Sequence, residues 1–259
     1  MLKTIRYGGD LIYSAWDEEG VLEVVDAFGV RSLHFGTPPR QSAMNLRQPE
    51  RLELAYVRAM LSGLLFAPTP ARVLLVGLGG GSLAKFLLRE FPLCQIEAVE
   101  RRAGVAKVAR QFFGLPQDER LKVHFADGET FLLDRSHHEE SLFDHILVDA
   151  YDHIGMDQSI NGEAFFQACL GLLRKDGVLS INLWGTHGDS LKRSLALLRG
   201  FFPNRAFRLG VPNRGNIIGV GLGEEVDVAS PRKLAPRAQS LENQLSLEFS
   251  QFLRNLKRL

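Results

Sequence analysis

A glycine-rich segment is the feature that most constrains this chain. The apolar run Val73–Val76 breaks into Gly77-Leu78-Gly79-Gly80-Gly81 and then enters a helical pattern that Ser82 can cap. Glycine allows backbone φ values that are closed to other residues, and it lets a backbone approach a ligand closely. A strand, a glycine turn and a helix in this order predict a ligand-binding turn of an α/β sheet, with Gly77, Gly79 and Gly81 in the site.

An acidic residue follows at a spacing typical of ribose recognition. Glu100 closes the strand pattern Gln95–Glu100, about where a dinucleotide-binding fold places the acid that contacts the ribose. A carboxylate there can accept hydrogen bonds from both ribose hydroxyls, and the alternative is a solvated glutamate at a strand end. Ser82 stands where the dinucleotide fingerprint has its last glycine. An adenosyl ligand without a pyrophosphate therefore fits this loop at least as well.

Strand and helix patterns alternate from Val73 to about Leu222. Strands separated by helices pair in parallel through right-handed crossovers, so we expect an α/β, Rossmann-like, doubly wound and mostly parallel seven-stranded sheet. The short connection Gly210–Gly215 predicts an antiparallel hairpin at the sheet edge. The expected strands are residues 72–76, 95–99, 121–125, 144–149, 177–183, 205–209 and 216–222.

The rest of the chain divides into two smaller regions. Residues 1–70 predict a β-hairpin, with strands at 21–25 and 31–35, followed by a helix over 49–65. Residues 71–224 form the expected adenosyl-ligand-binding domain. Residues 225–259 form a tail whose apolar stripe predicts a helix packed on its own domain or on a partner subunit.

Composition excludes several classes of function. Of the 259 residues 45% are apolar, enough for a full core, and the net charge of +1 offers no general attraction for nucleic acid. Cys94 and Cys169 lie in apolar patterns without metal-ligand spacing, which favours buried thiols in a reducing compartment. No apolar run reaches membrane-spanning length, and the first residues lack a signal-peptide core. We expect a cytoplasmic protein without a metal, a nucleic-acid partner or a membrane partner.

Acids close three successive strand patterns after the glycine turn: Glu100, Asp127 and Asp149. Ligands of open α/β sheets bind beyond the carboxyl ends of the strands, so these side chains should line one crevice. Asp127, before Gly128, can accept a hydrogen bond from an adenine amino group, cap the next helix, or do both. Asp149 and Asp152 can hold a cation, position an amine or supply a base, and the alternative is a pair of solvated turn acids.

These motifs, in this order, resemble those of the spermidine synthases, or polyamine aminopropyltransferases. The resemblance implies a class I methyltransferase fold with a small N-terminal β domain, polyamine biosynthesis, a small-molecule amine substrate and a homodimer. It implies that the glycine loop, Glu100 and the Asp127-Gly128 pair hold decarboxylated S-adenosylmethionine. It also makes Asp149 the base and Asp152 an acceptor-binding acid. Gln41 and Tyr56 look like the glutamine and tyrosine that this family carries upstream of its first Rossmann strand.

The chain departs from the family pattern at several positions. Gly80 replaces an aspartate that grips the donor's propylamine, Val57 replaces a histidine, Arg102 replaces a second acid, and Val211 replaces a tyrosine. Three interpretations therefore stay open. The first is an aminopropyltransferase that uses S-adenosylmethionine or its decarboxylated form. The second is an S-adenosylmethionine-dependent methyltransferase, since Gly80 would not repel the carboxylate that S-adenosylmethionine retains. The third is a non-catalytic adenosyl-ligand-binding protein.

Overall fold

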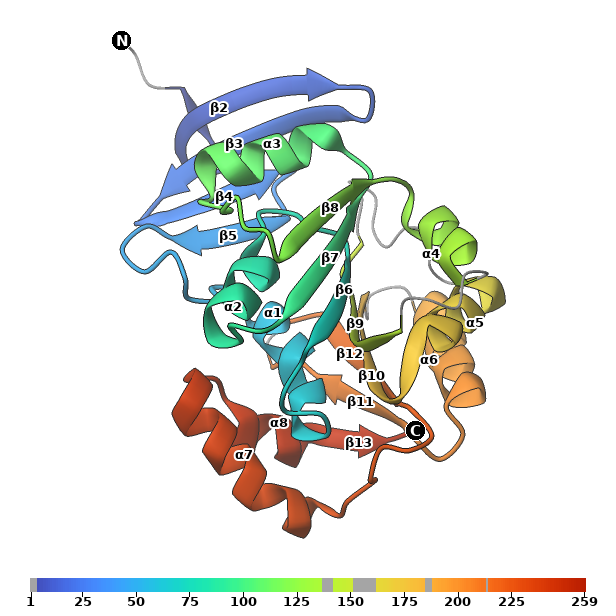
Figure 1. Ribbon diagram of the computed structural model, residues 1–259. Helices are drawn as coiled ribbons and strands as arrows, with labels where there is room; N and C mark the ends of the chain where they lie inside the picture. The colour runs from blue at the N-terminus through green and yellow to red at the C-terminus, as the bar shows by residue number, and fades with distance from the viewer. Residues whose placement is uncertain (1–3, 137–141, 151–161, 185–187, 213) are drawn as a thin grey trace.

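Two separate β-sheets form the framework of the molecule (Figure 1). The computed structural model describes residues 4–136, 142–150, 162–184, 188–212 and 214–259. The N-terminal sheet has five antiparallel strands in chain order: β1 (Ile5–Arg6), β2 (Gly9–Asp17), β3 (Gly20–Ala27), β4 (Val30–His34) and β5 (Ser42–Asn45). Phe28 and Gly29 join β3 to β4 with φ values of 51° and 77°, as a tight two-residue hairpin turn requires. The expected hairpin at residues 21–35 is therefore part of a larger sheet.

The central sheet has the spatial order β13-β11-β12-β10-β9-β6-β7-β8. Neighbouring strands from β10 to β8 run parallel, whereas β12 pairs antiparallel with both β10 and β11. The strand order reverses between β6 and β9, which opens a crevice at their carboxyl ends. The strands are β6 (Arg72–Val76), β7 (Gln95–Glu100), β8 (Leu121–Phe125), β9 (Phe143–Val148), β10 (Leu173–Trp184), β11 (Ala206–Gly210), β12 (Asn216–Leu222) and β13 (Leu256–Arg258).

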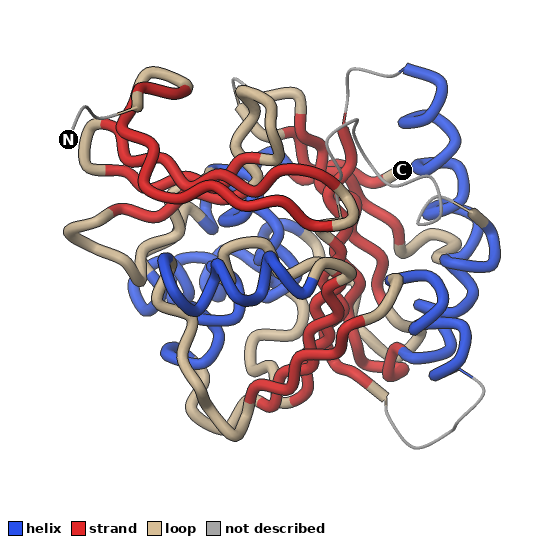
Figure 2. Tube along the Cα trace, turned by 90° about the horizontal axis from the view of Figure 1, so that it is seen from above, coloured by secondary structure: helices blue, strands red, loops and turns tan. Residues whose placement is uncertain are grey.

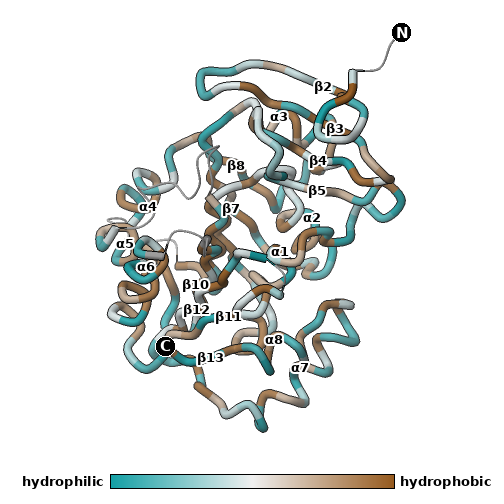
Figure 3. The backbone as a smooth tube through the Cα atoms, turned by 180° about the vertical axis from the view of Figure 1, so that it is seen from behind, coloured by the Kyte–Doolittle hydropathy of each residue, from teal (hydrophilic) through white to brown (hydrophobic). Residues whose placement is uncertain are grey.

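Helices cover both faces of the central sheet (Figure 2). One core, under α4 (Gly128–Ser136), α5 (Glu163–Leu172) and α6 (Gly188–Phe201), contains Phe165, Phe166 and Phe202. The opposite core lies under α2 (Ser82–Glu90), the short α1 (Ala55–Met60), the 3₁₀ turn Leu61–Leu65, α7 (Pro231–Leu245) and α8 (Phe249–Asn255). Hydrophobic segments concentrate along the central strands (Figure 3), as expected for a sheet buried on both faces.

Helix α3 (Ala103–Phe112) joins the two sheets. Val105 and Val108 pack with the N-terminal sheet, whereas Ala106 and Ala109 pack in the core of the central sheet. These two pairs lie on adjacent faces of the helix, so each face is covered by a different sheet. This packing fixes the N-terminal sheet beside the carboxyl ends of β6 and β7.

The structure differs from the sequence-based expectation in three elements. The helix expected over residues 49–65 is only α1 followed by the 3₁₀ turn, and the tail holds two helices instead of one. The tail then returns to the sheet, where β13 pairs with β11 and makes eight strands instead of seven. Leu256-Lys257-Arg258 has no apolar alternation that would predict a strand. It is a strand because its backbone pairs with β11 at the edge of the sheet. Within the described residues, no helix is long and apolar enough to cross a bilayer.

Candidate active site

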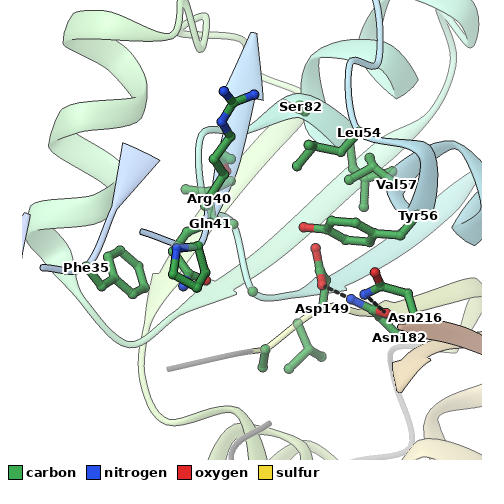
Figure 4. Close-up of a pocket in the computed structure, with 18 of the residues that line it drawn as sticks. Phe35, Arg40, Gln41, Leu54, Tyr56, Val57, Ser82, Asp149, Asn182 and Asn216 are labelled. Carbon is green, nitrogen blue, oxygen red and sulfur yellow. Dashed lines mark hydrogen bonds between the residues drawn. The ribbon is translucent and has the colours of Figure 1, made fainter. Parts of the chain in front are cut away.

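A cavity of about 1160 Å³ opens where the strand order reverses. Its walls come from both sheets and from α1 and α6, and Figure 4 shows side chains from several of these elements converging on it. It collects eight of the residues that the sequence singled out: Gln41, Tyr56, Gly77, Gly79, Glu100, Asp127, Gly128 and Asp149. Asp152 lies outside the described residues.

The glycine loop is shaped by close neighbours. Gly77 has φ 96°, and a Cβ there would collide with the backbone carbonyl of Asp149. Gly79 has φ 52°, and its Cβ would lie 2.6 Å from Oγ of Ser42. Only glycine combines a positive φ with room for so close a neighbour. The loop therefore packs directly against the Asp149 backbone and the Ser42 side chain.

Two residues of this segment act differently from the expectation. Gly81 has φ 74° and packs under Leu115, away from the cavity, so its glycine serves the turn into α2. Ser82 is the first residue of α2 and makes no side-chain capping hydrogen bond, because left-handed Gly81 takes the N-cap position.

Gly80 occupies a closed position instead of an open one. Its N–H donates to Oγ of Ser42 over 2.7 Å, and a Cβ would lie 3.0 Å from both the Phe113 ring and the Ser42 side chain. Gly80 does not contribute to the cavity lining. A carboxylate at position 80 would therefore require Ser42 and Phe113 to move.

Glu100 at the end of β7 binds the loop as well as facing the cavity. Its carboxylate accepts hydrogen bonds from the N–H groups of Leu78 (3.2 Å), Gly79 (3.4 Å) and Arg102 (2.9 Å). Burial raises the pKa of Glu100, and the three N–H donors and the Arg102 charge oppose that rise. Carboxylate lone pairs remain available for ribose hydroxyls.

Arg102 ties the N-terminal sheet to this corner. Its guanidinium pairs with Asp17 through bonds of 2.7 and 3.1 Å, donates to the carbonyl of Gly20, and lies 4.5 Å from the Phe35 ring centre. Asp17 and Gly20 are the ends of the β2–β3 turn. The arginine that replaces an acid in the family pattern thus docks this turn beside Glu100.

Asp127 has the capping role that the sequence left open. One carboxylate oxygen accepts hydrogen bonds from the N–H of Thr130 (2.9 Å) and from its hydroxyl (3.0 Å), which fixes the start of α4. Asp127 also lines the cavity, so an adenine contact through its other oxygen stays a prediction.

Asp149 is the carboxylate at the centre of the site. Its backbone N–H donates to the carbonyl of Val76, and its Oδ1 accepts a hydrogen bond of 2.8 Å from Asn182. Burial raises the pKa of Asp149 to about 6, against the opposing effect of hydrogen bonds from Asn182 and Tyr56. A carboxylate with such a pKa is ionised at neutral pH and is a stronger base than ordinary aspartate.

The structure adds residues that sequence reasoning missed. Asn182, Asn216 and Ser42 are buried polar side chains that line the cavity. The signal for Asn182 was a polar residue inside the apolar pattern 178–183 of β10, whereas Ser42 comes from a separate sheet and gave no signal. Among the residues described, no group of histidine, cysteine or acidic side chains could hold a metal ion.

Comparison with known proteins agrees with this architecture. The family model for the spermine/spermidine synthase domain matches residues 54–204. A polyamine aminopropyltransferase of Chromobacterium violaceum is 33% identical over 242 residues, which cover 91% of this chain and 89% of the relative. A probable spermidine synthase of Corynebacterium glutamicum superposes with a TM-score of 0.72 at 23% identity, covering 91% of this chain and 86% of that one.

A fourth similarity points to the related methyltransferases. Human methyltransferase-like protein 13, solved in complex with SAH, superposes with a TM-score of 0.68 at 28% identity and covers 74% of this chain and 93% of that one. The sheet and its site thus define a Rossmann-like, methyltransferase-type α/β protein. Within that class, the chain belongs to the spermine/spermidine synthase family.

Proposed function

We propose that this protein is a transferase that moves the aminopropyl group of decarboxylated S-adenosylmethionine to a small amine, as in polyamine biosynthesis. The observation that carries the proposal is Asp149, a buried base held against the glycine loop in the cavity. Family membership and the matching transferase relatives support it.

The cavity has the features that an adenosyl donor needs. The left-handed glycines 77 and 79 keep side chains out of the loop, and Glu100 offers lone pairs at the far end of β7. The volume of about 1160 Å³ is ample for a nucleoside donor together with an amine. Gln41 from the N-terminal sheet lines the cavity, and we assign it to the donor as well.

The chemistry is a displacement at the carbon bonded to the positive sulfur. The lone pair of a neutral amine forms the new C–N bond while the C–S bond breaks. The electron pair of the C–S bond stays with sulfur, and methylthioadenosine leaves. The amine becomes positive and gives its proton to the Asp149 carboxylate. Before that step the same carboxylate attracts the cationic acceptor, and Tyr56 and Asp152 help to orient it.

Methyl transfer from S-adenosylmethionine is the second candidate. Two observations favour it. Position 80 is closed and carries no carboxylate that could bind the amine of a decarboxylated donor, and Arg40 is a cation that lines the cavity. Arg40 could attract the carboxylate that S-adenosylmethionine retains.

One assay separates the candidates. The protein is given each donor with a panel of short diamines and monoamines, and the nucleoside products are identified by mass spectrometry. We expect methylthioadenosine. Adenosylhomocysteine would establish methyl transfer. If no pair of donor and amine gives either product, the protein is a non-catalytic binding protein. We also propose that the protein is cytoplasmic and forms a homodimer. The buried free thiols of Cys94 and Cys169 support the cytoplasmic location.

A further inference from the structure

Two buried asparagines form a chain of hydrogen bonds that ends on Asp149. Asn216 Nδ2 donates to Asn182 Oδ1 over 3.0 Å, and Asn182 Nδ2 donates to Asp149 Oδ1 over 2.8 Å (Figure 4). Asn182 is 2% exposed and Asn216 5% exposed. Hydrogen bonds between buried amides restrict the orientation of both side chains.

The sheet register brings the three residues together. Asn182 on β10 follows Ile181, the partner of Val148, so it lies beside Asp149 at the end of β9. Asn216 begins β12, where its partner on β10 is Trp184, two residues beyond Asn182. The pair is therefore diagonal across two antiparallel strands, within reach of each other's side chains.

The direction of the chain has a chemical consequence. An asparagine amide can present either its oxygen or its nitrogen to a neighbour, but Asn216 donates to the oxygen of Asn182. The ionised Asp149 carboxylate can only accept, so the nitrogen of Asn182 faces Asp149 and the oxygen of Asn182 is left for the Asn216 N–H. Tyr56 approaches Asp149 from the other side (Figure 4), and its hydroxyl can either donate or accept.

We propose that Asn216 and Asn182 are positioning residues that keep Oδ1 of Asp149 as a permanent acceptor and leave Oδ2 to take the amine proton. The inference rests on the proposed function for its chemical meaning. The orientation itself is a property of the unliganded protein and can be measured without activity.

The first test is an NMR titration of the Asp149 carboxyl carbon in the unliganded protein, where we expect a wild-type midpoint at about pH 6. Asn182→Leu removes the donor to Oδ1 and should raise the midpoint by about one pH unit. Asn216→Asp should raise it at least as far, because a carboxylate at 216 accepts from Asn182 and turns the amide oxygen toward Asp149. In the Asn182→Leu background, Asn216→Leu should add nothing.

The second test is single-turnover rate against pH, expressed as the ratio of variant to wild type. The base works when ionised, so with a midpoint one pH unit higher Asn182→Leu should lose about fivefold near pH 6 and recover most of that loss near pH 9. Asn182→Leu keeps the other titratable groups that line the described part of the cavity, so the ratio compares the same set: Glu19, Glu53, Tyr56, Glu100, Asp127 and four arginines.

Ser180→Ala is the matched control. Ser180 lies two residues before Asn182 on the same side of β10 and is fully buried, and its hydroxyl has no hydrogen-bond partner in the described structure. It should leave both the midpoint and the rate unchanged. An unmoved Asp149 midpoint in Asn182→Leu, fully additive effects of the two asparagines, or an equal loss of rate at every pH would each overturn the inference. A wild type without turnover but with the expected midpoint shifts would instead refute the proposed function alone.

Discussion

At the scale of single residues, the charge of Asp149 is held at a cost to stability. Its folded-state pKa of about 6 lies above the ordinary value of 3.8, so folding disfavours the ionised form. The cost is complete above about pH 6 and disappears as the pH falls below the ordinary value, where both states are protonated. An asparagine side chain in the same place has nearly the same shape, carries no charge and would not bear this cost.

We therefore expect Asp149→Asn to unfold with a larger free energy than the wild type at about pH 8. The gain should be about 1–2 kcal/mol, because solvent in the cavity screens part of the full effect of the shift. Denaturant titrations at about pH 8 and about pH 4 measure it. An advantage that is equal at both pH values would show that Asp149 has an ordinary pKa.

Glu100 should be essential for donor binding. Replacement by glutamine removes a charged acceptor for ribose hydroxyls and also disturbs its bonds to the N–H groups of Leu78 and Gly79. Calorimetry with methylthioadenosine should show binding weakened by about 1–3 kcal/mol. Unchanged affinity would remove Glu100 from the site.

The residues of the site were predictable from sequence to different degrees. Glycines 77 and 79 and the strand-end acids could be found, because residues at the carboxyl ends of parallel strands line the ligand-binding crevice of such a sheet. Asn182 and Asn216 could not be paired, because their meeting depends on the register of two antiparallel strands. The capping role of Asp127 could be named as an alternative, but only its bonds to Thr130 reveal it.

At the scale of elements, the β2–β3 turn is docked beside Glu100 by the ion pair between Arg102 and Asp17. The Arg102 side chain is 7% exposed and that of Asp17 26%, whereas the neighbouring Arg101–Glu19 pair is exposed to 41% and 32%. Burial and bidentate geometry make the first pair the stronger one.

A double-mutant cycle tests this difference. Arg102→Met with Asp17→Asn should give a coupling energy of about 2 kcal/mol in unfolding experiments. The control cycle on Arg101 and Glu19 should give no more than about 0.5 kcal/mol. Equal couplings would mean that Arg102 does not dock the turn.

Elements were predicted best where the hydrophobic pattern was strongest. The strands expected at 72–76 and 216–222 have those same bounds in the structure, because buried strands read as continuous apolar runs. The strand expected at 121–125 also keeps its bounds, although it is a partly exposed edge strand with an alternating pattern. Strands β1, β2, β5 and β13 were missed, since short or half-exposed strands take their identity from their partners. The helix expected from 49 begins only at Ala55, before which the chain is irregular.

At the scale of the whole molecule, the cavity belongs to both sheets. Gln41 and Ser42 bring the start of β5 against the glycine loop, where Oγ of Ser42 accepts the hydrogen bond from the Gly80 N–H. A ligand in this cavity should therefore order two segments that are far apart in sequence.

Hydrogen exchange measures that coupling. Saturating methylthioadenosine should slow amide exchange in residues 77–81 and in residues 40–43 together. Residues 23–27 of the N-terminal sheet, none of which lines the cavity, serve as the internal reference. Protection confined to 77–81 would show that the N-terminal sheet is not a wall of the binding site.

The central claim is that Asp149 accepts the proton of the attacking amine, and single-turnover transfer by Asp149→Asn tests it most directly. With donor prebound and the acceptor in excess, release of the nucleoside product should slow by about two to four orders of magnitude, the usual contribution of a general base. Donor affinity, measured in parallel, should stay close to that of the wild type. Full turnover by Asp149→Asn would contradict the account and leave Asp149 as a structural residue at the end of its strand.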